Sequence, residues 1–160
     1  MTSEEIARLV RIAVGLDIKN VKLTGGEPLV RKDITEIVAK IGKIRGVRDL
    51  SMTTNGTLLA KYAKELHDAG LLRVNVNIPT LKADVYSKLT GGKLNDVLKG
   101  IEEAVKVGLY PVKLNMLVLK GVNDQEVWDM VGFAGKTGTI LQLIELEPIN
   151  ITDEYYKMHH

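Results

Sequence analysis

The chain of 160 residues contains no cysteine. This absence excludes disulfides, zinc sites built from thiolates and iron–sulfur clusters ligated by cysteine alone. Neither sign of charge is in excess, because 22 Lys and Arg against 20 Asp and Glu leave a formal charge of +2. That balance does not indicate a nucleic-acid partner or a membrane surface, although a few well-placed cations would be enough for a small anionic substrate.

Long apolar runs are also missing: no stretch approaches the ~18 consecutive apolar residues of a membrane-spanning helix, so we expect no membrane partner. The first ten residues, MTSEEIARLV, lack the charged and then apolar pattern of a secretory signal, so we expect a cytoplasmic protein. Apolar residues make up 45% of the chain, enough for one core, and no Pro/Gly/Ser-rich linker divides it. We therefore expect residues 1–160 to form a single domain.

Short apolar runs alternate with amphipathic segments along the whole chain. The runs favour five strands, at residues 21–24, 49–53, 73–78, 112–119 and 140–147. The amphipathic segments predict helices at 2–15, 33–43, 58–69, 83–89, 95–107 and 124–134. Thr2 and Glu5 fit a capping box at the start of the first helix. This alternation is typical of right-handed βαβ crossovers and a parallel sheet.

Unusual residues follow each predicted strand. They are the segment 24–27, the segment 53–55, Asn77, Asn115, and the pair Glu145 and Glu147. In a (β/α) barrel the carboxyl ends of the strands surround one mouth, where chemistry is usually placed. The pattern therefore favours a barrel over a doubly wound sheet.

The sharpest local signal is the turn Gly25-Gly26-Glu27-Pro28 directly after the first strand. Two glycines allow close approach of the backbone to a ligand, and the exposed N–H and C=O groups can bind a zwitterion. Glu27 offers a carboxylate to an ammonium group, and Pro28 stiffens the exit from the turn. The residues alone are equally compatible with a tight βα turn without a ligand.

The run from Lys22 to Arg31 resembles the corresponding segment of the GTP 3',8-cyclases of molybdenum cofactor biosynthesis, which are radical S-adenosylmethionine (SAM) enzymes. Further segments match that family in order and spacing: Thr53-Thr54-Asn55-Gly56, Ala69-Gly70-Leu71, Val74-Asn75-Val76, Lys113-Leu114-Asn115, Lys120-Gly121-Val122-Asn123-Asp124 and Leu143-Ile144-Glu145-Leu146. The resemblance covers nearly the whole chain.

The resemblance implies an α/β fold, an incomplete parallel (β/α) barrel of radical SAM type with its first strand missing. It implies the conversion of GTP to 3',8-cyclo-7,8-dihydro-GTP, with SAM and [4Fe–4S] clusters as cofactors. The family binds its first cluster through a CxxxCxxC loop after that first strand, and a second cluster lies in a C-terminal extension. Because this chain has no cysteine, we predict that it is inactive by itself.

The resemblance also assigns ligand-binding residues. The SAM-binding positions fall on Gly25, Gly26, Glu27, Pro28, Asn77 and Glu147. Asn77 replaces a serine and Glu147 a methionine of the family. The GTP-binding positions fall on Lys22, Thr53 and Lys113. The two lysines have apolar neighbours in their strands, so they should point away from them, into the barrel or into the helical layer.

Three departures from the family pattern stand out. Gln142 occupies the place of an arginine, and Asn77-Ile78-Pro79 replaces Ser-Leu-Asp. The missing first strand should leave unpaired backbone groups at the sheet edge. We therefore expect the chain either to pair through that edge as a homodimer or to be only marginally soluble.

Other functions remain open at this point. One is a non-catalytic relative that binds a nucleotide or a partner protein, and another is a different branch of the radical SAM enzymes. A third is a cofactor-free lyase of the aldolase kind, with Lys113 or Lys22 forming a Schiff base.

Overall fold

The computed structural model describes residues 1–148 and 154–160. Its centre is one sheet of five parallel strands in the order β1-β2-β3-β4-β5. The strands are β1 (Asn20–Leu23), β2 (Asp49–Thr54), β3 (Arg73–Asn77), β4 (Val112–Val118) and β5 (Ile140–Glu145). Each strand is followed by at least one helix, as expected for parallel crossovers.

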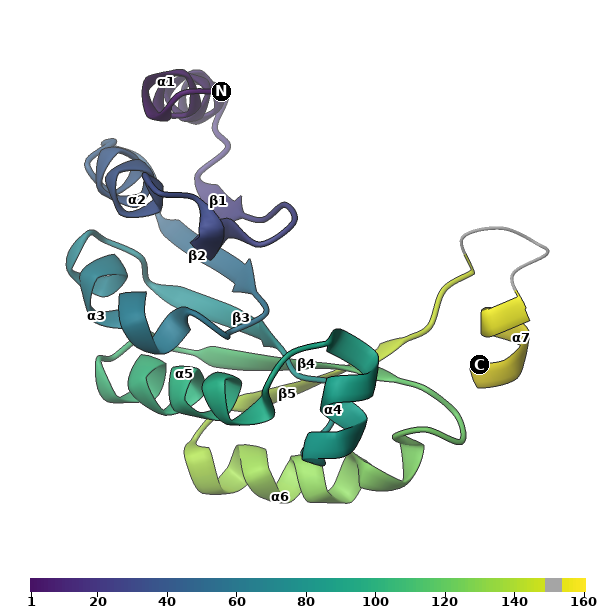
Figure 1. The fold of residues 1–160 in the computed structure, drawn as a ribbon. Helices are drawn as coiled ribbons and strands as arrows, with labels where there is room; N and C mark the ends of the chain where they lie inside the picture. Colours follow the sequence, from purple (N-terminus) through teal and green to yellow (C-terminus); the bar gives the residue numbers. More distant parts are fainter. Residues whose placement is uncertain (149–153) are drawn as a thin grey trace.

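The helices lie mainly on the convex face of the curved sheet (Figure 1). They are α1 (Ser3–Gly15), α2 (Ile34–Gly42), α3 (Leu59–Asp68), α4 (Ala83–Thr90), α5 (Leu94–Lys106), α6 (Val127–Thr137) and α7 (Glu154–His159). Helices α2, α3, α5 and α6 cover the convex face, whereas α4 and α7 lie near the carboxyl ends of the strands. The opposite, concave face of the sheet is uncovered over most of its width.

The core lies between the convex face and the helices. Alternate side chains of the strands, such as Met52, Val74 and Leu114, are fully buried there against helix residues such as Ile41 and Ile101. Since side chains alternate between the faces of a strand, the residues between these positions point to the concave face. This alternation puts most polar residues of the strands on the open side of the sheet, with Thr54 and Glu145 as exceptions.

Local signals in the sequence explain several element boundaries. The capping box at α1 is confirmed, because Glu5 N–H donates to Thr2 Oγ1 at 3.2 Å and Thr2 N–H donates to Glu5 Oε2 at 2.7 Å. Helices α4 and α6 end at Gly91 and Gly138, whose φ of 70° and 68° favours glycine. The cap at Gly91 ends α4 shortly before α5 begins, and the cap at Gly138 ends α6 shortly before β5 begins.

Other boundaries differ from those that the sequence predicts. A 3₁₀ turn, η1 (Pro28–Val30), follows the glycine pair, and the helix expected from residue 124 begins with a second such turn, η2 (Asp124–Glu126). The α-helix itself starts at Val127. The reason is that Asn123 and Glu126 use their side chains in contacts with the segment after β3, which fix the chain in a tighter turn.

The sheet is not closed, which confirms the expected incomplete barrel: β1 and β5 are its two edge strands. Apolar side chains are exposed on α1 at Leu9 and Ile12, and at Leu16 just after it. None of the helices in residues 1–148 and 154–160 combines the length and the apolar character that crossing a membrane requires.

Candidate functional site on the concave face

The three predicted GTP-binding residues project from the same face of the sheet. Lys22 of β1, Thr53 of β2 and Lys113 of β4 each alternate with side chains of the core, so they point to the concave face. In the strand register Thr53 pairs with Asn75 and Asn75 pairs with Lys113. Lys22 lies one row closer to the amino ends of the strands, beside Ser51. The structure therefore brings these residues to one surface and puts neither lysine in the helical layer.

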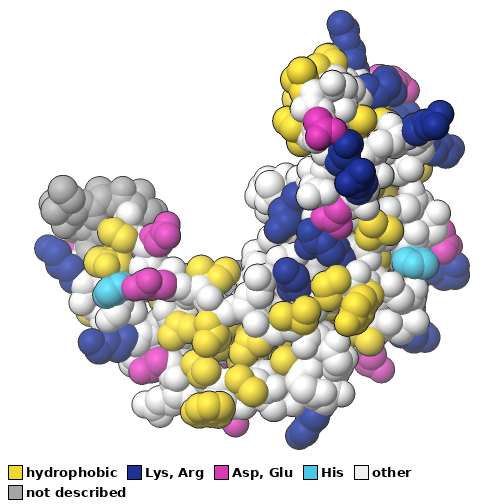
Figure 2. All heavy atoms as spheres, turned by 180° about the vertical axis from the view of Figure 1, so that it is seen from behind, with side chains coloured by type: hydrophobic (Ala, Val, Ile, Leu, Met, Phe, Trp, Pro, Cys, Tyr) yellow, Lys and Arg dark blue, Asp and Glu magenta, His cyan; other side chains and the backbone are white. Residues whose placement is uncertain are grey.

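An ion pair adds further charged groups to this face, near the amino ends of β2 and β3. Arg73 donates to Asp49 through both Nε (2.9 Å) and Nη2 (2.6 Å). The hydrogen bond and the charge of Asp49 raise the pKa of Arg73 against the opposing effect of burial. Figure 2 shows the hollow of the molecule, with Lys and Arg side chains gathered along the arm that carries the N-terminal elements.

The glycine pair after β1 lies at the rim of this face. A side-chain carbon added at Gly25 or Gly26 would meet no atom within 4 Å, so both residues border open space. Gly25 has a φ of 153°, in the range that favours glycine. The turn therefore exposes backbone N–H and C=O groups where a ligand can approach closely.

The Glu27 carboxylate accepts three hydrogen bonds from its own chain. Its Oε1 accepts hydrogen bonds from Thr54 Oγ1 (2.6 Å) and Leu29 N (3.0 Å), and its Oε2 accepts one from Asn55 N (2.6 Å). The carboxylate thus fastens the glycine turn to the end of β2. Pro28 follows as the first residue of η1. The groups of this turn that remain for a ligand are mainly those of the backbone.

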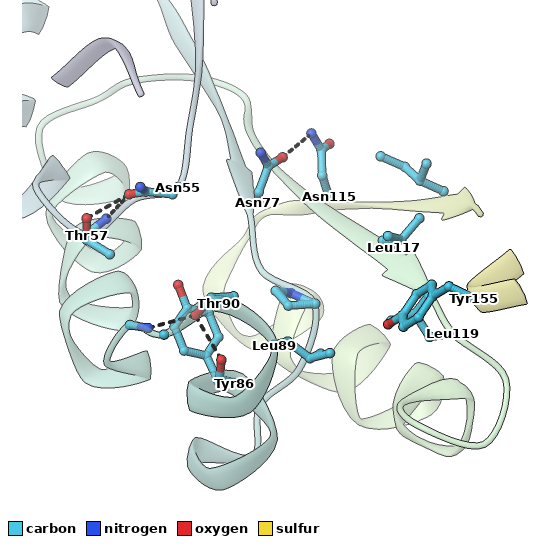
Figure 3. A pocket seen from close by; sticks show the side chains of 14 residues that line it. Asn55, Thr57, Asn77, Tyr86, Leu89, Thr90, Asn115, Leu117, Leu119 and Tyr155 are labelled. Atoms are coloured by element: carbon cyan, nitrogen blue, oxygen red, sulfur yellow. Dashed lines mark hydrogen bonds between the residues drawn. The ribbon is translucent and has the colours of Figure 1, made fainter. Parts of the chain in front are cut away.

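Asn77 lies at the carboxyl end of β3 and lines a pocket of about 760 Å³. Its Oδ1 accepts a hydrogen bond from Asn115 Nδ2 of β4 at 3.0 Å, and Figure 3 shows the two amides pointing toward each other at the pocket wall. Leu117 of β4 and Leu119 just after it form an apolar part of the wall, and Tyr155 of α7 lies beside them. The pocket therefore joins polar groups to a surface that suits a flat apolar ring.

Glu147, the last predicted SAM-binding residue, follows β5 and is exposed. It does not line the pocket that contains Asn77. The structure therefore brings together the glycine turn, the concave floor and the asparagine pair, but it leaves Glu147 outside this group.

Two polar residues of the concave floor were missed by sequence reasoning. Asn75 Nδ2 donates to Gln142 Oε1 at 3.1 Å, across the width of β4. The alternation in Arg73-Val74-Asn75-Val76-Asn77 carried a signal for Asn75, because every second residue of this strand is polar. The pairing with Gln142 carried none, since 67 positions separate the two residues.

The sequence profile of the Radical SAM superfamily matches residues 1–134, most of the chain. The chain belongs to the radical SAM superfamily. Two curated relatives support the resemblance to the GTP 3',8-cyclases. A probable GTP 3',8-cyclase of Thermococcus kodakarensis is 64% identical over 148 residues, which are 92% of this chain and 47% of that protein. The GTP 3',8-cyclase of Alkaliphilus oremlandii is 44% identical over 98% of this chain and 49% of that protein.

The chain spans about half the length of these curated relatives. Among solved structures, Streptococcus suis SuiB bound to S-adenosylmethionine superposes with a TM-score of 0.80, covering 95% of this chain and 35% of SuiB. With 19% sequence identity, that likeness shows the shared fold, and the profile match over residues 1–134 shows the radical SAM type.

The two cofactors of the superfamily fit this chain unequally. The sequence supplies no thiolate, and among the residues with described positions no group of three His, Asp or Glu side chains could hold a metal ion. A [4Fe–4S] cluster therefore has no ligands in this chain. The open space at Gly25 and Gly26, by contrast, leaves room for the polar end of SAM.

Proposed function

We propose that this chain is the binding scaffold of a cytoplasmic GTP 3',8-cyclase, the enzyme that converts GTP to 3',8-cyclo-7,8-dihydro-GTP in molybdenum cofactor biosynthesis. The observation that carries the proposal is the shared concave face of Lys22, Thr53 and Lys113, with the glycine turn at its rim, in a chain 64% identical to a probable GTP 3',8-cyclase.

The proposal assigns GTP to the concave floor. Lys22 and Lys113 would bind the triphosphate as point charges, and Thr53 would hydrogen-bond between them. Among the residues with described positions no ion pair involves either lysine, and the carboxylate of Asp49 is paired with Arg73. A triphosphate therefore meets unpaired positive charge rather than a neutralised pair.

The proposal assigns SAM to the glycine turn and to the pocket with Asn77. The backbone of Gly25 and Gly26 would bind the amino acid end of SAM, while the pocket of about 760 Å³ has room for its nucleoside. Glu27 and Pro28 would keep the turn in place, with Glu27 acting through its bonds to β2. Because Glu147 lies apart from these groups, we propose for it at most a contact at the outer rim.

Since the chain has no thiolate, we propose that it binds both small molecules without turning them over. Calorimetric titration of GTP and of SAM tests this directly. We expect Lys113→Ala and Lys22→Ala each to weaken GTP binding about tenfold or more, because a charge-assisted contact contributes about 1.5–3 kcal/mol. The matched control is Lys99→Ala, which removes an exposed lysine of α5 on the outer side of the molecule. Absence of GTP binding, or an equal effect of Lys99→Ala, would refute the proposal.

We also propose that a second copy of this chain pairs at the β1 edge. The outer side of this strand has no hydrogen-bonded neighbour among the strands described above, and an unpaired edge invites association. Exposed Leu9 and Ile12 of α1, and Leu16 just after it, add apolar area that a second copy could cover. Light scattering should show a dimer that Ile12→Glu converts to a monomer, and a wild-type monomer at high concentration would exclude it.

A further inference from the structure

Asn75 combines deep burial with an unpaired polar atom. Only 6% of the residue is exposed. Its Nδ2 donates to Gln142 Oε1 at 3.1 Å, but its Oδ1 is buried and has no hydrogen-bond partner in the described part of the chain. Asn123, the other buried asparagine, differs: its Oδ1 accepts from Leu119 N–H, and its Nδ2 donates to the carbonyls of Pro79 and Leu117.

An unpaired buried acceptor destabilises the free protein, because the group loses its hydrogen bond to water and gains none in return. Valine would fit the centre of a strand better than asparagine does. Groups that break the local rules of stability in this way tend to lie at functional sites. Asn75 is therefore a candidate for a contact that forms only when a ligand is bound.

The position of Asn75 says which ligand it would contact. In the register it lies between Thr53 on β2 and Lys113 on β4, each one strand spacing of about 4.8 Å away. A molecule that touches both of these residues must cross Asn75. We propose that Asn75 is a further ligand-binding residue, which accepts a hydrogen bond from a ribose hydroxyl of a nucleoside triphosphate whose phosphates lie at Lys113.

The chemistry of the two partners supports this choice of atom. An unpaired amide oxygen needs a donor, and the phosphate oxygens next to a lysine are acceptors. The ribose hydroxyls are the donors of a nucleotide that lie nearest to its phosphates along the covalent chain. The inference rests on the proposed binding of GTP at the concave floor, and it adds a residue that hydrogen-bonds the ribose.

The first test compares two ligands on two proteins. Titration of the full chain with GTP and with 2',3'-dideoxy-GTP measures whether Asn75 and the sugar hydroxyls act together. We expect Asn75→Ala to weaken binding of GTP about threefold to tenfold, the effect of one hydrogen bond, and to leave binding of the dideoxy analogue unchanged. Such coupling would not arise from a merely structural role.

Equal weakening of both ligands, or no weakening of either, would overturn the assignment of Asn75 while the proposed binding of GTP would stand. If the wild-type chain bound neither ligand, the proposed function would fail, and the assignment of Asn75 with it. The three results are therefore distinguishable.

The second test needs no ligand. If Asn75 is retained for binding, Asn75→Val should leave the midpoint of thermal unfolding of the free protein unchanged or raise it. Asn123→Val is the control, and it should lower the midpoint because it breaks three buried hydrogen bonds. A lower midpoint for Asn75→Val than for the wild type would show that the amide stabilises the fold, and would overturn the proposal.

Discussion

The carboxylate of Glu27 can be tested as a structural clamp by the substitution Glu27→Gln. Three donors converge on it: the Thr54 hydroxyl, the Asn55 N–H and the Leu29 N–H. A glutamine keeps the shape of the side chain but replaces one acceptor oxygen by an NH₂ group, which itself donates. In either orientation of the amide, at least one of the three donors then faces another donor.

The size of the effect follows from these contacts. Hydrogen bonds to a charged group contribute about 1.5–3 kcal/mol, against about 0.5–1.5 kcal/mol for neutral pairs. Losing one bond and weakening the others would cost about 2–4 kcal/mol in a dry site. Glu27 is partly exposed, so water can replace part of the loss, and we expect about 2 kcal/mol. For a chain of this length that corresponds to a fall of about 4–8 °C in the unfolding midpoint.

Urea unfolding followed by circular dichroism measures this difference, with the slope of the transition as a check that both proteins unfold alike. The control is Glu65→Gln, the same chemical change at an exposed position of α3, which we expect to alter stability by less than about 0.5 kcal/mol. If Glu27→Gln were as stable as the wild type but lost its affinity for SAM, the carboxylate would be a ligand-binding group and the clamp would be refuted.

Two other contacts allow tests of stability. A side-chain carbon at Gly100 would lie 2.5 Å from the carbonyl oxygen of Gly56, so Gly100→Ala should lower the free energy of unfolding by about 1–2 kcal/mol. Gly135 on α6 borders open space, and Gly135→Ala should raise the free energy of unfolding by up to about 1 kcal/mol. Equal effects of the two substitutions in urea unfolding would contradict this prediction. The hydrogen bond from Lys40 lowers the pKa of Glu36 below its usual value of 4.5. The stability that this bond contributes is therefore present above that value and is lost as the pH falls through the lowered pKa. Glu36→Gln should therefore make the free energy of unfolding fall less steeply below about pH 4.5. If the unfolding midpoint of this variant depended on acidic pH in the same way as that of the wild type, the contact between Glu36 and Lys40 would not contribute to stability.

The fold was predictable because its signals are local. Apolar runs predict each of the five strands to within two residues at their ends, and the alternation around Lys113 predicts a side chain on the face opposite to its apolar neighbours. Helix ends at Gly91 and Gly138 follow from the positive φ that glycine accepts at a helix end. These features depend on residues within a few positions of each other.

The chemistry of the site was less predictable because it depends on distant pairs. The partners of Glu27 lie 27 and 28 positions away, at Thr54 and Asn55. A carboxylate beside two glycines suggests a ligand-binding group when only its neighbours in sequence are known. Leu29 N–H is a local donor, but the donors from Thr54 and Asn55 are revealed only when β1 and β2 are placed side by side.

The proposed binding residues can be studied apart from any cluster chemistry, because the chain has no thiolate. Every residue proposed here to contact GTP is an ordinary lysine, threonine or asparagine of the sheet, whose contact requires neither iron nor reducing conditions. Affinities measured in air on the cysteine-free chain would thus report the scaffold alone. If Lys113 and Asn75 act as proposed, the cysteine-free chain should still bind the phosphates and the ribose of GTP with measurable affinity. The reason is that backbone pairing within the sheet positions both residues, and no metal is needed for this.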